Sequence, residues 1–89
     1  MANKRTLKHT INQVCESLFV EAVAATVYRD DVKEDNAEAL LHSIINTQTD
    51  FVTRVSHPEP GMKPKLYYKV LREQFAAQAS DIVDHINNM

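Results

Sequence analysis

The chain contains a single glycine, Gly61, among 89 residues. Glycine supplies most of the positive-φ positions that tight β-hairpin turns require. A chain with one glycine therefore has few places where an antiparallel sheet could reverse direction, and helices are the favoured secondary structure. That glycine lies in SHPEPGMKPK, residues 56–65, together with all three prolines, so the strongest turn signal of the chain is confined to one place.

Apolar residues recur at intervals of three and four along three segments, which is the spacing of one face of an α-helix. The first segment extends from about Lys4 to Tyr28, and the second ends before Pro58, because a residue that precedes proline avoids the α conformation. Cys15, Phe19 and Val23 are expected to widen the apolar face of the first segment. The apolar positions are Leu7, Ile11, Val14, Leu18, Ala22 and Ala25, then Leu40, Leu41, Ile44, Ile45, Phe51, Val52 and Val55, then Tyr68, Leu71, Phe75, Ala79, Ile82 and Ile86.

Three long helices with short connections predict an all-α fold, a three-helix antiparallel (up-down-up) bundle that forms one domain over residues 1–89. The polar stretch RDDVKEDN, residues 29–36, separates the first two helices. Asp35 and Glu38 have the spacing of a capping box and would start the second helix. Asp31 and Glu34 have the same spacing, so a start one turn earlier remains open.

The proline-rich stretch reads as a helix connector. Pro60 and Gly61 fit the two central positions of a type II turn, in which the glycine takes a positive φ. Pro64 suits the first position of a helix, where its missing N–H is no loss. Substituting Gly61 by valine is therefore expected to strain the turn.

The first helix carries more apolar surface than a three-helix bundle can cover. Residues 18–28, LFVEAVAATVY, are apolar on nearly every side. A second stripe, rotated away from the core face, comprises Val20, Ala24 and Val27, with Tyr28 beside it. We expect a two-fold homodimer through this stripe, since sustained apolar patches mark interfaces. The alternative is that alanines and single valines are simply exposed, as they often are.

Charge is unevenly distributed between the two ends of the predicted bundle. The candidate surface for an anionic partner at the basic end comprises Lys4, Arg5, Lys8, Lys63, Lys65, Tyr67, Lys69 and Arg72. The opposite end collects Glu21, Asp30, Asp31, Glu34, Asp35, Glu38, Asp81 and Asp84. The basic end could receive RNA, phosphate or an acidic protein, with Tyr67 stacking on a base. The alternative is an ordinary solvated charge distribution, and nucleic acid is not the favoured partner.

No motif of known chemistry is present. The histidines lack the spacing of a zinc site, and Cys15 has no neighbouring base, so it is expected to be structural. Gln48 falls near the middle of the bundle and is expected to form a hydrogen bond with Gln74 that fixes the register. The alternative is that Gln48 lines a polar ligand cleft between the helices. We therefore predict no catalytic residue, no metal and no cofactor.

These observations predict a small non-catalytic interaction or regulatory module with a protein partner. The second hypothesis is an RNA- or ribosome-associated protein that uses the basic end. No apolar run approaches the ~20 residues of a membrane span, and no signal peptide is recognisable. With a single cysteine, Cys15, the chain has no intrachain disulfide. A cytoplasmic protein without membrane contact is expected.

Overall fold

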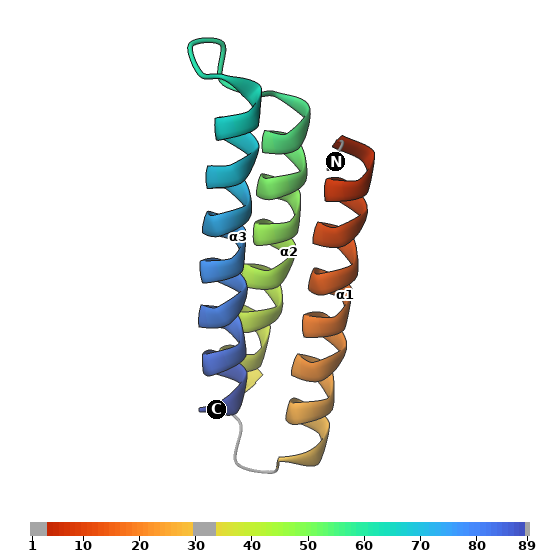
Figure 1. Cartoon of the computed structure of the whole chain (residues 1–89). Coiled ribbons are helices and arrows are strands. Elements are labelled where there is room, and N and C mark those ends of the chain that lie inside the picture. Colours follow the sequence, from red (N-terminus) through yellow and green to blue (C-terminus); the bar gives the residue numbers. More distant parts are fainter. Residues whose placement is uncertain (1–3, 30–33, 89) are drawn as a thin grey trace.

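The computed structural model describes residues 4–29 and 34–88, and it confirms the all-α bundle. The helices are α1 (Lys4–Tyr28), α2 (Glu34–Ser56) and α3 (Pro64–Asn87). They lie side by side in up-down-up order, and no strand occurs within the described ranges (Figure 1). The molecule measures 48 × 20 × 16 Å. The start of α1 and the α2–α3 connection lie at one end, and the end of α1 lies at the other with the C-terminus (Figure 1).

The core is built from one stripe of each helix, as the spacing of three and four predicts. Two aromatic rings in the core, Phe51 and Phe75, meet edge to face with their centroids 5.3 Å apart. Val23 does not belong to the core, because its side chain is 37% exposed, so its predicted place on the core face was wrong. The buried apolar residues are Leu7, Ile11, Cys15, Leu18, Ala22, Leu40, Ile44, Phe51, Val55, Leu71, Phe75, Ile82 and Ile86.

The polar contact inside the bundle links α1 to α2, and the predicted pairing of Gln48 with Gln74 was wrong. Gln48 Nε2 donates to Asn12 Oδ1 over 2.8 Å. Successive helical residues are rotated by about 100°, which places Gln48 on the flank of α2 that faces α1. Gln74 instead accepts a hydrogen bond from Arg54 Nη1.

Charged side chains stabilise two of the helix ends. α2 starts at Glu34, so Asp35 is not its N-cap, and the earlier start at Asp31 falls outside the described residues. Glu34 and Asp35 occupy the first turn, where carboxylates stabilise the positive end of the helix dipole. At the far end, Arg29 Nη1 donates to the carbonyl of Ile86 over 3.3 Å and so ties the end of α1 to the last turn of α3.

The α2–α3 connection differs from the predicted type II turn. Met62 N donates to Glu59 O over 3.2 Å, which closes a turn around Pro60 and Gly61. Gly61 does not have a positive φ, so type II is excluded. Proline fits the second position of a type I turn equally well, and type I needs no glycine. A Cβ added at Gly61 would have no atom within 4 Å.

We predict that Gly61→Ala stabilises the protein by about 0.4–1 kcal/mol, because the added Cβ restricts the unfolded chain and meets nothing in the folded one. Thermal unfolding measures the effect, and for a domain of this size the melting temperature should rise by a few degrees. A fall in melting temperature would show that the turn requires the conformational freedom of glycine.

Candidate functional site

The outward face of α1 carries an apolar stripe opposite the core. Val20 and Val27 are 66% and 68% exposed, and Val23 lies between them. The three valines follow one another at intervals of three and four, so they form one line along the helix. Gln13 and Glu16 continue this line toward the N-terminus, which limits its apolar part to residues 20–27. We call Val20, Val23 and Val27 the valine stripe.

The two other residues of the predicted dimer surface flank the valine stripe differently. Tyr28 is the most exposed large apolar residue of the described chain, at 85%. Ala24 is half-buried, so it contributes little free surface. The sequence interpretation missed Val23, although its spacing from Val20 and Val27 was available.

The basic end gathers the predicted cations. The start of α1, the end of α2 and the start of α3 lie together there (Figure 1). Lys8 is half-buried and the others are exposed, and none of them forms an ion pair within residues 4–29 and 34–88. Neither α1 nor α3 has an acidic residue in its first turn. The cations there lie near the positive ends of the two helix dipoles, where positive charge is unfavourable. These cations are Lys4, Arg5, Lys8, Lys63, Lys65, Lys69 and Arg72.

Tyr67 does not join this cationic surface. It is rotated by about 160° around α3 from both Lys65 and Lys69. Its hydroxyl donates to the carbonyl of Arg54 over 2.8 Å, and Tyr68 donates in the same way to Val55 over 3.2 Å. The last carbonyls of a helix lack intrahelical partners. The two tyrosines therefore satisfy carbonyls in the last turn of α2, a role that spacing alone did not indicate.

We predict that Tyr67→Phe destabilises the protein by about 1 kcal/mol, because it removes a hydrogen bond that satisfies the end of α2. Chemical denaturation measures the change. Tyr28→Phe is the matched control, since the Tyr28 hydroxyl makes no hydrogen bond within the described residues. Equal stabilities of the two variants would contradict the capping role.

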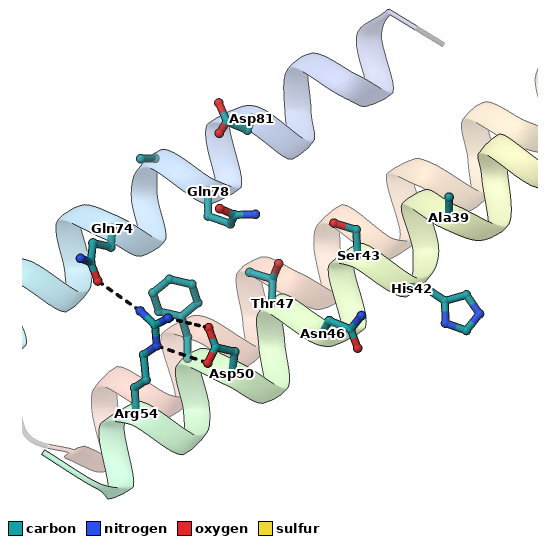
Figure 2. Close-up of a pocket in the computed structure, with 12 residues that line it drawn as sticks. Ala39, His42, Ser43, Asn46, Thr47, Asp50, Arg54, Gln74, Gln78 and Asp81 are labelled. Atoms are coloured by element: carbon teal, nitrogen blue, oxygen red, sulfur yellow. Dashed lines mark hydrogen bonds and ion pairs between the residues drawn. The ribbon is translucent and has the colours of Figure 1, made fainter.

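A polar groove of about 860 Å³ lies between α2 and α3 (Figure 2). Hydroxyls, amides and carboxylates line most of it, and Ala39 and Ala77 leave it wide. We call it the α2–α3 groove. Its polar lining consists of His42, Ser43, Asn46, Thr47, Asp50 and Arg54 on α2, with Gln74, Gln78 and Asp81 on α3.

Arg54 closes one end of the α2–α3 groove. Its Nε donates to Asp50 Oδ1 over 3.2 Å, and its Nη2 lies 3.0 Å from Asp50 Oδ2, which makes a two-point ion pair. Its Nη1 donates across the groove to Gln74 Oε1 over 3.2 Å (Figure 2). The guanidinium also lies 4.9 Å from the centre of the Phe51 ring. The ion pair is solvent-exposed and contributes little energy by itself, but its geometry links α2 to α3.

Thr47 lies at the floor of the α2–α3 groove and is the buried polar residue of the described chain, 7% exposed. Its side chain points into the space between the two helices (Figure 2). Its hydroxyl takes part in none of the hydrogen bonds within residues 4–29 and 34–88. Gln48 does not line this groove; together with Asn12 and Thr49 it lines a smaller pocket of about 260 Å³ between α1 and α2, and a ligand cleft at Gln48 stays a prediction. Thr47 and Gln48 both continue the spacing from Ile44, so the pattern could not separate them.

The described residues offer few groups for catalysis or metal binding. Cys15 is buried, and this burial raises the pKa of its thiol, which keeps it protonated and unreactive. No three residues among the described histidines, cysteines and carboxylates lie close enough to hold a metal ion. None of the described helices combines the length and hydropathy needed to cross a membrane.

No protein-family model, curated protein or solved structure matches this chain.

Proposed function

We propose that the protein is a cytoplasmic, non-catalytic interaction module that self-associates through the valine stripe of α1. The observation that carries this proposal is the exposure of Val20 and Val27, at 66% and 68%, on the side of α1 opposite the core. Apolar side chains in one line on a helix gain free energy when a second surface removes them from water. The buried free thiol of Cys15 is compatible with a reducing compartment.

The spacing of the valines favours a second copy of the same helix as the occupant. Val20 and Val27 are seven residues apart with Val23 between them, which matches the a and d positions of a heptad. β-Branched residues at a positions suit pairs of helices when leucine occupies d, so Val20 and Val27 fit a pair whereas Val23 at d does not favour one. A two-fold pair of α1 helices would bring each valine stripe against its own equivalent, and such isologous dimers are the commonest oligomers.

The size of the stripe sets the expected strength of the dimer. The apolar part spans residues 20–27, about 10 Å of helix. A stable interface usually buries about 800 Å² on each partner, which is more than three valines and Tyr28 can provide. Self-association is therefore expected to be reversible and to depend on protein concentration.

An RNA- or phosphate-binding role for the basic end has weaker support. Its cations lack ion-pair partners within the described residues, which suits an anion. However, the Tyr67 hydroxyl is engaged with the end of α2, and its ring lies on the other side of α3 from Lys65 and Lys69. The aromatic platform expected for base stacking is thus not part of that surface.

We predict that the native protein shows a mass that rises with concentration in analytical ultracentrifugation, and that Val20→Lys with Val27→Lys keeps it monomeric. Lysines at these positions would place charges in an interface that buries apolar side chains. Leu66→Lys is the matched control, because Leu66 is 49% exposed on α3, outside the stripe.

The control variant should associate like the native protein, and circular dichroism should show native helix content in every variant. A native protein that stays monomeric at millimolar concentration would overturn the proposal. So would a double variant that associates as strongly as the native chain.

A further inference from the structure

We draw no further inference here: the strongest candidate, the exposed lysine patch at the basic end where the first turns of α1 and α3 lie together, rests on surface cations at two helix N-termini, and nothing within residues 4–29 and 34–88 shows what binds there.

Discussion

The structure depends on the burial of one apolar stripe from each of three helices against the other two. Leu18 of α1, Ile44 of α2 and Phe75 of α3 belong to this shared core. Burial of each such side chain contributes roughly 1.5–3 kcal/mol, so the core accounts for most of the favourable free energy. A bundle of three helices covers only one side of each of them. The outward sides are free, and differences among those sides determine what the molecule can bind.

The sequence alone was sufficient for the helices and most of the core, because the spacing of apolar residues directly reports which side of a helix is buried. It was insufficient where two residues satisfied the same spacing. Thr47 and Gln48 both follow Ile44, and only the rotation of α2 relative to its neighbours decides which of them faces α3. The predicted turn type at Gly61 was wrong for another reason: Pro-Gly is compatible with both type I and type II turns, so these two residues alone do not select one.

The long polar side chains were the least predictable part of the candidate sites. Arg54, Tyr67 and Arg29 all make contacts that join different helices or their ends. Such contacts depend on the separation of the backbones, which a single sequence does not encode in any simple spacing. The contact of Arg54 with Gln74 links α2 to α3 at one end of the α2–α3 groove. Small and polar residues line the rest of the groove. The basic end, by contrast, could be predicted from the sequence, because the up-down-up order brings the start of α1, the end of α2 and the start of α3 together.

The central claim is that the outward side of α1 is covered by a second copy of the chain in solution. Isotope-filtered nuclear Overhauser spectroscopy on an equimolar mixture of ¹³C-labelled and unlabelled protein tests it most directly, because it detects only contacts between copies. The account predicts intermolecular contacts from the methyl groups of Val20, Val23 and Val27. Absence of intermolecular contacts at millimolar concentration, or contacts confined to other helices, would contradict it.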